Sequence, residues 1–194
     1  MDLEKVKALR PTHVIVNVDE NKKETADALA GFVPNLIVTH PLAPLDNLAL
    51  YRQIGNAFER QREAELLCEK FDAAFRLVKE RTFVQRTVLY LIWKNPWMTV
   101  SRDTYVSRTL ALFGLHTLPE RSAARYPDLK DLDLPEIDLI LLSTEPYRFG
   151  DSDANEIQEK TRKPTRLIDG EMTSWYGPRA IAGLRYLRDF AATL

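Results

Sequence analysis

Cysteine is almost absent from this sequence of 194 residues, because Cys68 is the only one. A single cysteine permits no disulfide bond within the chain and excludes metal sites built from several cysteines. Cys68 stands beside Leu67 and Phe71 on the apolar face of a predicted helix. We therefore expect a buried and unreactive thiol.

An excess of charge of one sign and long hydrophobic runs are also missing. The chain has 27 Lys and Arg against 28 Asp and Glu, a formal net charge of -1, which gives no electrostatic reason to expect a nucleic-acid partner. No apolar run approaches the roughly 20 residues that span a bilayer. The charged start, Met1–Lys7, differs from a signal peptide, so this chain by itself is expected to be cytoplasmic.

Motifs of common enzymes are missing as well. There is no Gly-x-Ser-x-Gly, no Walker-type loop and no Gly-x-Gly-x-x-Gly after a strand. The three histidines, His13, His40 and His116, have no His or Cys neighbour at ligand spacing, and only His40, at a strand end, is a candidate axial ligand of a metal. An enzyme on this chain would use Glu145 and Asp169 as acid and base, although no spacing argument brings these carboxylates together.

What is present is an alternation of strands and helices. Strand His13–Val18, a helix from about Lys22 to Phe32 and strand Leu36–Thr39 form a strand–helix–strand unit. Their β-branched, apolar strands are typical of a parallel sheet that is covered on both faces. The same order returns after Arg81, and we predict an α/β fold.

Helical periodicity dominates the region from Leu45 to about Arg81. We predict two consecutive helices that join near Glu59 to Arg62. The second would contain about 20 residues and span roughly 30 Å, which is long enough to bridge two lobes.

The second half contains three predicted strands and three predicted helices. The strands are Val88–Ile92, Ile137–Leu142 and Arg166–Ile168, and the helices cover about 103–113, 154–160 and the segment from Pro178 onward.

Aromatic residues gather after two of these strands. Trp93–Met98 follows the first and Asp169–Pro178 follows the third, so all three tryptophans are predicted to lie in loops after strands. Open α/β sheets bind ligands outside the carboxyl ends of their strands, and the pattern favours a site for a large, flat, partly apolar ligand. The other interpretation is that these rings only cap the core. For Asp169, the other interpretation is a hydrogen bond within its own turn; for Glu145, it is capping of a nearby helix.

The segments from Trp93 to Phe113, Glu145–Tyr147 and Asp169–Arg179 resemble class III substrate-binding proteins of ABC transporters, the helical-backbone metal receptors. The resemblance is closest to the group that binds vitamin B12. It implies two Rossmann-like α/β lobes joined by a long helix, with ligand held in an aromatic cleft between the lobes. The implied bounds are 1–59 for the N-terminal lobe, 60–82 for the bridging helix and 83–194 for the C-terminal lobe. The N-terminal lobe would be incomplete, because the first strand and helix of the family have no counterpart here.

The resemblance also implies ligand-binding roles. Trp93 and Trp97 match two aromatic residues around an Asn-Pro, and Tyr126-Pro127 matches an aromatic-Pro pair. Asn17 stands where some members carry tryptophan, so this chain departs from the cobalamin-binding pattern there. Together with the acidic and aromatic residues after the strands, these positions give the predicted ligand-binding set: Trp93, Asn95, Pro96, Trp97, Tyr126, Glu145, Tyr147, Asp169, Trp175 and Tyr176.

The expected function is uptake of a corrinoid or a related metal chelate, with no catalytic residues, no resident metal and no cofactor. A haem or a ferric siderophore is the alternative ligand, and an anionic siderophore would use Arg102, Arg148 and Arg179. A cytoplasmic enzyme and a truncated, ligand-free remnant that forms a homodimer are the alternatives from other classes.

An ABC permease is the partner that the resemblance implies. Family members dock through one glutamate on each lobe, and Glu24 and Asp131 (or Asp133) are the nearest matches. The resemblance also implies a location outside the inner membrane if the N-terminus is truncated.

Overall fold

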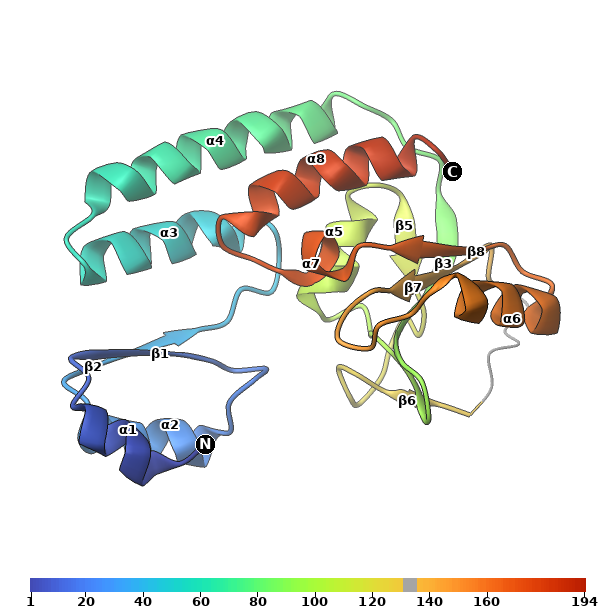
Figure 1. Cartoon of the computed structure of the whole chain (residues 1–194). Coiled ribbons are helices and arrows are strands. Elements are labelled where there is room, and N and C mark those ends of the chain that lie inside the picture. The colour runs from blue at the N-terminus through green and yellow to red at the C-terminus, as the bar shows by residue number, and fades with distance from the viewer. Residues whose placement is uncertain (131–135) are drawn as a thin grey trace. The chain divides into compact units, whose positions relative to one another are not determined.

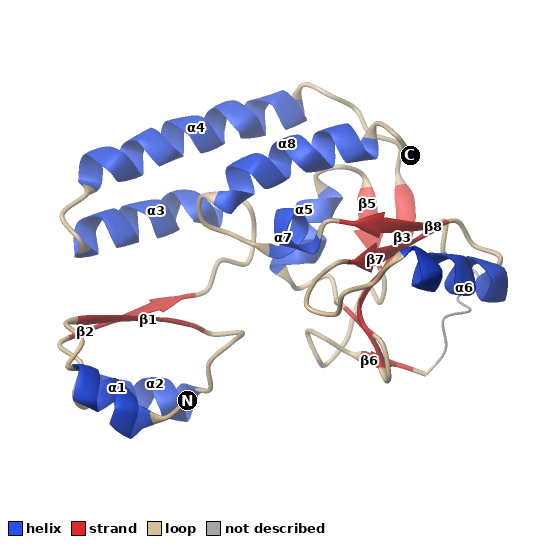
Figure 2. Ribbon diagram, viewed as in Figure 1, coloured by secondary structure: helices blue, strands red, loops and turns tan. Residues whose placement is uncertain are grey.

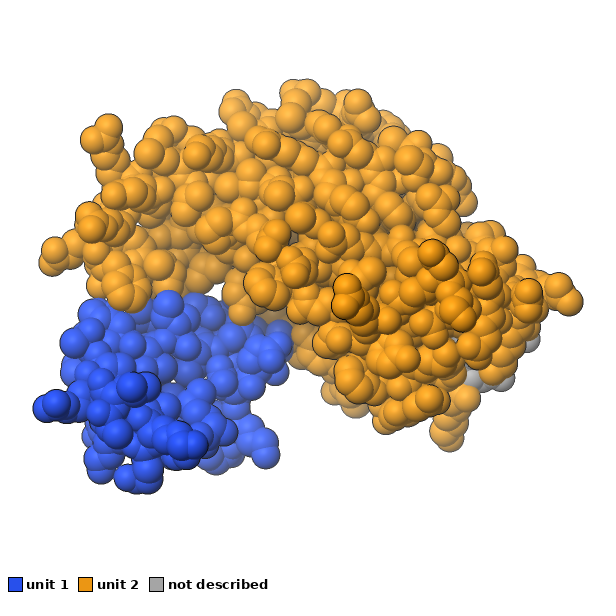
Figure 3. All heavy atoms as spheres, viewed as in Figure 1, with its two compact units in different colours: residues 1–41 blue, residues 42–194 orange. Residues whose placement is uncertain are grey.

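The computed structural model describes residues 1–130 and 136–194, which form an α/β protein of two compact units, Met1–Pro41 and Leu42–Leu194. Figure 1 labels the elements, Figure 2 distinguishes helices from strands, and Figure 3 colours the two units. The predicted α/β class is therefore confirmed. The bounds implied for the two lobes and the bridging helix stay predictions.

Unit 1 contains a parallel pair of strands and two helices: α1 (Leu3–Leu9), β1 (His13–Asn17), α2 (Lys23–Ala30) and β2 (Asn35–Thr39). The predicted strand–helix–strand order is confirmed. Its small core is Val16, Leu29 and Val33. Ile15 and Val38 are 52% and 48% exposed, so the helices of unit 1 cover only one face of this sheet. The expectation of cover on both faces is wrong here, because two short helices lie on the same side of two strands.

Unit 2 begins with the predicted helix pair, α3 (Asp46–Ala57) and α4 (Gln61–Lys79). The join falls at Phe58–Arg60, where Glu59 adopts a φ of 55°. A Cβ at Gly55 would lie 2.5 Å from the Cβ of Ala64, so glycine lets the two helices approach closely.

Cys68 is 2% exposed on α4, as expected, and burial raises the pKa of its thiol.

The rest of unit 2 is built around a six-stranded sheet of order β6-β4-β3-β7-β8, with β5 also paired to β3. The strands are β3 (Arg86–Trp93), β4 (Trp97–Thr99), β5 (Leu115–Thr117), β6 (Asp128–Leu129), β7 (Leu139–Ser143) and β8 (Thr165–Ile168). The helices are α5 (Tyr105–Ala111), α6 (Asp151–Thr161), α7 (Gly170–Ser174) and α8 (Arg179–Ala191). β3, β5, β7 and β8 run parallel, and β4 is antiparallel to β3 and β6.

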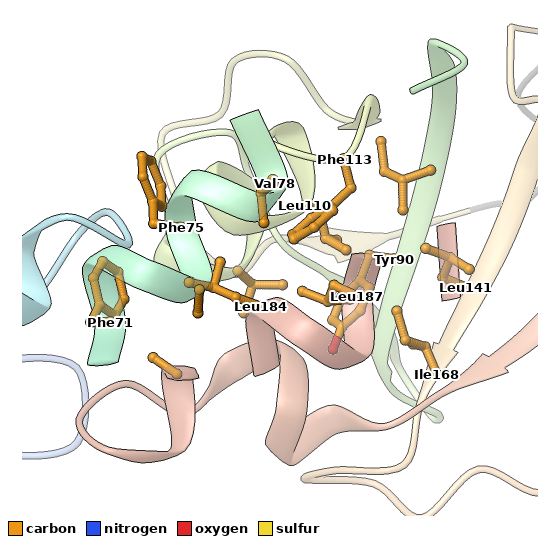
Figure 4. Packing of buried hydrophobic residues seen from close by; sticks show 14 of the residues in the cluster. Phe71, Phe75, Val78, Tyr90, Leu110, Phe113, Leu141, Ile168, Leu184 and Leu187 are labelled. Carbon is orange, nitrogen blue, oxygen red and sulfur yellow. The ribbon is translucent and has the colours of Figure 1, made fainter. Parts of the chain in front are cut away.

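Both faces of this sheet are buried. Successive residues of a strand point to opposite faces, so β3 and β7 each contribute to two separate cores. Along β3, Val88 and Tyr90 join the core shared with α4, α5 and α8, whereas Leu89 and Leu91 join a second core with Ile157 of α6. Figure 4 shows the first core, to which α4 contributes Phe71, α8 contributes Leu184 and β3 contributes Tyr90. The unbroken apolar runs of β3 and β7 are the sequence signal for this double burial.

The contact between α7 and α8 depends on Gly183. A Cβ at this position would lie 2.3 Å from the backbone oxygen of Met172. We expect Gly183→Ala to lower the free energy of unfolding by roughly 1–2 kcal/mol, since the overpacking cost exceeds the helix propensity that alanine gains. Urea titration followed by circular dichroism measures it. The control is Ala182→Ser at a neighbouring exposed position, expected within about 0.5 kcal/mol of wild type. Equal midpoints for Gly183→Ala and wild type would contradict this packing.

Candidate ligand-binding site

The carboxyl ends of three parallel strands meet at one edge of the sheet in unit 2. β3 ends at Trp93, β7 at Ser143 and β8 at Ile168. The segments that follow carry nearly all the predicted site residues, and Figure 1 shows them at the ends of these strands. We call the side chains of Trp93, Trp97, Glu145, Tyr147, Phe149 and Trp175 the aromatic edge.

The first aromatic segment is a hairpin rather than a loop. Trp93 is the last residue of β3 and Trp97 the first of β4, and the two strands pair antiparallel. Between them, Asn95 adopts a φ of 64° and the Asn95–Pro96 peptide is cis, which turns the chain back within three residues. The prediction that these two tryptophans lie in a loop is wrong. The Asn-Pro pair reverses the strand instead of ending the sheet.

Four rings form a continuous row in the aromatic edge. Trp93 meets Tyr147 edge to face at 5.5 Å between ring centroids, and Tyr147 lies 4.6 Å from Phe149. Phe149 in turn stacks on Trp97 at 6.3 Å, with an interplanar angle of 7°. Phe149 is 3% exposed and Trp93 is 40% exposed. The row therefore runs from the core, where Phe149 anchors it, to solvent at Trp93.

An ion-paired lysine supports this row from the turn of the hairpin. Lys94 Nζ lies 2.7 Å from an Asp153 oxygen and 3.0 Å from a Glu156 oxygen, and 5.7 Å from the centroid of the Trp97 ring. Hydrogen bonds to the two carboxylates raise the pKa of Lys94, and the bond from Lys94 lowers the pKa of Asp153. The hairpin is thereby fastened to α6.

The lowered pKa of Asp153 predicts that its ion pair with Lys94 makes a pH-dependent contribution to stability. At neutral pH, Asp153→Asn is expected to cost about 1 kcal/mol of unfolding free energy. A lowered folded pKa means that this contribution is present above the ordinary value of 3.8 and is lost as pH falls through the lower folded value. Thermal unfolding of wild type and Asp153→Asn between pH 7 and pH 2.5 measures the gap, which is the difference between their unfolding free energies. A gap that stays constant over this range would contradict the ion pair.

The second aromatic segment contains the short helix α7, where a loop was predicted. Asp169 is its N-cap, and one carboxylate oxygen accepts a hydrogen bond from Met172 N at 3.1 Å. Asp169 thus makes the hydrogen bond within its own turn that was its other interpretation, and its role in ligand binding stays a prediction. Gly170 is close to the segment that follows β7, since a Cβ there would lie 2.7 Å from Glu145 N.

Trp175 follows α7 and is 45% exposed. Its indole Nε1 donates to both carboxylate oxygens of Glu145, at 3.0 Å each. The Arg179 guanidinium lies 5.8 Å from the Trp175 ring centroid and pairs with Glu171 at 3.0 Å. Glu145 therefore orients the indole, and Trp175 presents a fixed aromatic surface next to a cation.

Tyr176 and Tyr126 complete the predicted aromatic residues. Tyr176 packs edge to face on the buried ring of Tyr105, with 5.9 Å between centroids. Tyr126 is 36% exposed, and the Arg125 guanidinium lies 5.9 Å from its ring. Backbone bonds from Thr99 N to Pro127 O and from Ser101 N to Arg125 O place this segment beside β4.

Acid–base chemistry finds no support in this arrangement. Asp169 binds the α7 backbone and Glu145 binds Trp175, so each carboxylate has a separate structural donor. His40 lies in the other unit, 3.8 Å from an Asp19 oxygen. Within residues 1–130 and 136–194, no group of three or more His, Cys, Asp or Glu side chains is arranged to hold a metal ion.

The structure describes one of the predicted docking carboxylates. Glu24 is exposed in the first turn of α2, whereas Asp131 and Asp133 lie outside the described residues. Transporter docking by these residues stays a prediction.

Two features of the edge were missed from the sequence. Phe149, the anchor of the ring row, carried a signal, because it follows Tyr147 at the spacing that places both side chains on one side of an extended segment. The bond between Trp175 and Glu145 joins positions 30 residues apart and left no local signal.

Comparison with known proteins gives no family model and no curated protein that matches this sequence. Solved structures do match. A periplasmic haem-binding protein from Pseudomonas aeruginosa is similar at a TM-score of 0.77 and 16% identity, over 98% of this chain and 75% of that chain. The chain has the fold of ABC-transporter substrate-binding proteins.

Two further structures have this fold. An ABC-transporter substrate-binding protein from Listeria monocytogenes is similar at a TM-score of 0.76 and 16% identity, over 97% of this chain and 79% of that one. The periplasmic vitamin B12-binding protein of Vibrio cholerae is similar at a TM-score of 0.74 and 13% identity, over 100% of this chain and 78% of that chain. These are binding proteins of transporters rather than enzymes, and the fold that the resemblance implied is confirmed. In the described part of the chain, no helix has the length and apolar character to cross a membrane.

Proposed function

We propose that this protein is a substrate-binding protein of an ABC uptake system and that it binds a corrinoid or a related metal chelate. The observation that carries the proposal is the aromatic edge, where exposed rings of Trp93 and Trp175 stand at the carboxyl ends of parallel strands on the fold of binding proteins. A function of this class includes delivery to a permease and a location outside the inner membrane.

A flat, partly apolar chelate suits this edge. Large exposed aromatic side chains are costly in water and gain from stacking on a ligand ring. Trp93 is braced by Tyr147, and Trp175 is oriented by Glu145, so little side-chain entropy remains to be lost on binding. The amide of Asn95, in the turn between the hairpin strands, is a group that can meet the neutral amides of a corrin.

Charge separates the alternative ligands. An anionic siderophore needs several unpaired cations, but Arg102 pairs with Glu120 at 2.7 Å and Arg179 pairs with Glu171. Arg148 is exposed next to Tyr147 and has no ion-pair partner among the residues that the structure describes. One unpaired arginine favours a neutral corrinoid first and a haem, with two carboxylates, second.

Isothermal titration calorimetry with cyanocobalamin, haemin and a ferric catecholate siderophore tests the proposal. We expect saturable one-to-one binding of cyanocobalamin or haemin, and much weaker binding of the siderophore. Leu77→Ala, which alters an exposed apolar residue on α4, should leave the affinity unchanged. If the folded protein binds none of the three chelates, the proposal is wrong.

A further inference from the structure

One buried asparagine joins two segments of unit 2 that are distant in sequence. Asn47, in the first turn of α3, is 0% exposed. Its Nδ2 donates to Pro44 O at 2.8 Å and to the Tyr105 hydroxyl at 3.0 Å, and its Oδ1 accepts from Gly177 N at 2.6 Å. The amide orientation is fixed by its partners, because a carbonyl can only accept and a backbone N–H can only donate.

Both backbone groups of Gly177 bond to side chains of α3. Gly177 N donates to Asn47, and Gly177 O accepts from the buried hydroxyl of Tyr51 at 2.8 Å. Gly177 has a φ of 72°, and no neighbouring atom lies within 4 Å of where its Cβ would stand. Gly177 O also accepts a hydrogen bond from Ala180 N at 3.0 Å, at the start of α8. The bonds from Asn47 and Tyr51 are therefore the ones that tie this turn to α3. Trp175 and Tyr176 immediately precede Gly177.

The other side of Asn47 faces the chain where it enters unit 2. Asp46 accepts from Leu42 N at 2.8 Å and from Ala43 N at 2.9 Å, and Asn47 binds Pro44. The segment Leu42–Leu45, which continues directly from unit 1, is thereby tied to the start of α3. Asn47 is the residue that bonds both this segment and the Gly177 turn.

We propose that Asn47 is a positioning residue that couples the entry segment Leu42–Leu45 to the turn carrying Trp175 and Tyr176. One short, fully buried amide makes both bonds, so displacing either segment pulls the amide away from the other. In a binding protein, this coupling transmits a change at the junction of the two units to the aromatic edge. This consequence rests on the proposed function, whereas the coupling itself is a property of unit 2.

Hydrogen exchange measured by mass spectrometry tests the coupling without any ligand. Asn47→Ala removes both bonds, and we expect exchange to rise about tenfold or more in 42–46 and in 174–178. Tyr51→Phe removes only the hydroxyl bond to Gly177 O, and coupling predicts faster exchange in 174–178 with a smaller rise in 42–46. Asn56→Ala, at an exposed position of the same helix, should change neither segment.

Asn47→Asp shows whether the two segments are coupled through Asn47 or bonded to it independently. It keeps an acceptor for Gly177 N, and its other carboxylate oxygen can accept from the Tyr105 hydroxyl. That oxygen faces the Pro44 carbonyl without a hydrogen to donate, so the direct effect falls on the entry segment. Coupling predicts that 174–178 also exchanges faster, by about threefold or more. Faster exchange confined to 42–46 would overturn the proposal, and so would a uniform rise over the whole chain.

Trp175 supplies a second readout that also applies when a variant is partly destabilised. In a Trp93→Phe/Trp97→Phe background it is the only tryptophan, and adding Asn47→Asp should raise its acrylamide quenching constant. Unchanged quenching would contradict coupling. Cyanocobalamin and haemin are then titrated into wild type and into the Asn47 variants that keep all three tryptophans. Absence of binding in wild type rejects the proposed function and leaves the exchange result to decide the coupling.

Discussion

Replacing Trp175 by alanine is expected to weaken chelate binding about 10- to 100-fold, the range of a central aromatic residue at a binding surface. The indole is 45% exposed and held in one orientation by Glu145, so its area is available to a ligand without a large loss of side-chain entropy. Calorimetric titration of wild type and variant with the same chelate gives the ratio of dissociation constants.

Two further variants show whether this loss comes from the ring. Trp175→Phe keeps an aromatic surface but loses the bond to Glu145, and an intermediate loss is expected. Glu145→Gln keeps one acceptor for the indole N–H and should reduce affinity by less than Trp175→Ala. Affinity that is equal in wild type and Trp175→Ala would exclude this side chain from the site.

Replacing Phe71 by alanine is expected to lower the free energy of unfolding of unit 2 by about 3–5 kcal/mol. Phe71 is 0% exposed and contacts the rings of Tyr51 at 6.3 Å and Phe75 at 5.9 Å between centroids. Loss of this ring leaves a cavity between α3 and α4 in the core that also contains α8 and the sheet. Urea titration followed by far-ultraviolet circular dichroism measures the change.

The matched variant for Phe71→Ala is Leu77→Ala on the same helix. Leu77 is 43% exposed, and its loss should cost less than about 1 kcal/mol. Similar losses for the two variants would show that the buried face of α4 has been assigned incorrectly.

Hydrophobic pattern predicted most of the fold. The apolar run from Thr87 to Ile92 identifies β3, whose alternate residues enter the two cores of unit 2. The helical spacing of Phe71, Phe75 and Val78 identifies the buried face of α4. Such elements are decided by local periodicity, which a single sequence contains.

Tight turns limited the prediction elsewhere. The Asn95-Pro96 pair indicated only a break, and the pairing of Trp97–Thr99 with both β3 and β6 depends on a partner strand far along the chain. The five residues of α7 are too few to show a helical period, and the N-cap at Asp169 was only the second of two interpretations. Unit 1 shows the opposite limit, since pattern identified its strands but not the exposed face of the sheet.

The candidate site was predicted in composition but not in connectivity. The tryptophans and Tyr147 were identified because aromatic residues after strands are unusual and costly to expose. The contacts that orient them were not predicted, because the fold brings together Lys94 with Asp153 and Trp175 with Glu145 from distant parts of the chain. Asn47 had no distinguishing feature in the sequence, since its role depends on a turn 130 residues away.

Hydrogen exchange with and without cyanocobalamin, and in parallel with haemin, is the most direct test of the account. The account predicts that one of these chelates slows exchange in three segments of unit 2, 93–98, 144–149 and 169–178, and that Trp175→Ala reduces this protection. Saturable binding that protects other segments and leaves these three unchanged would contradict the aromatic edge as the ligand-binding site.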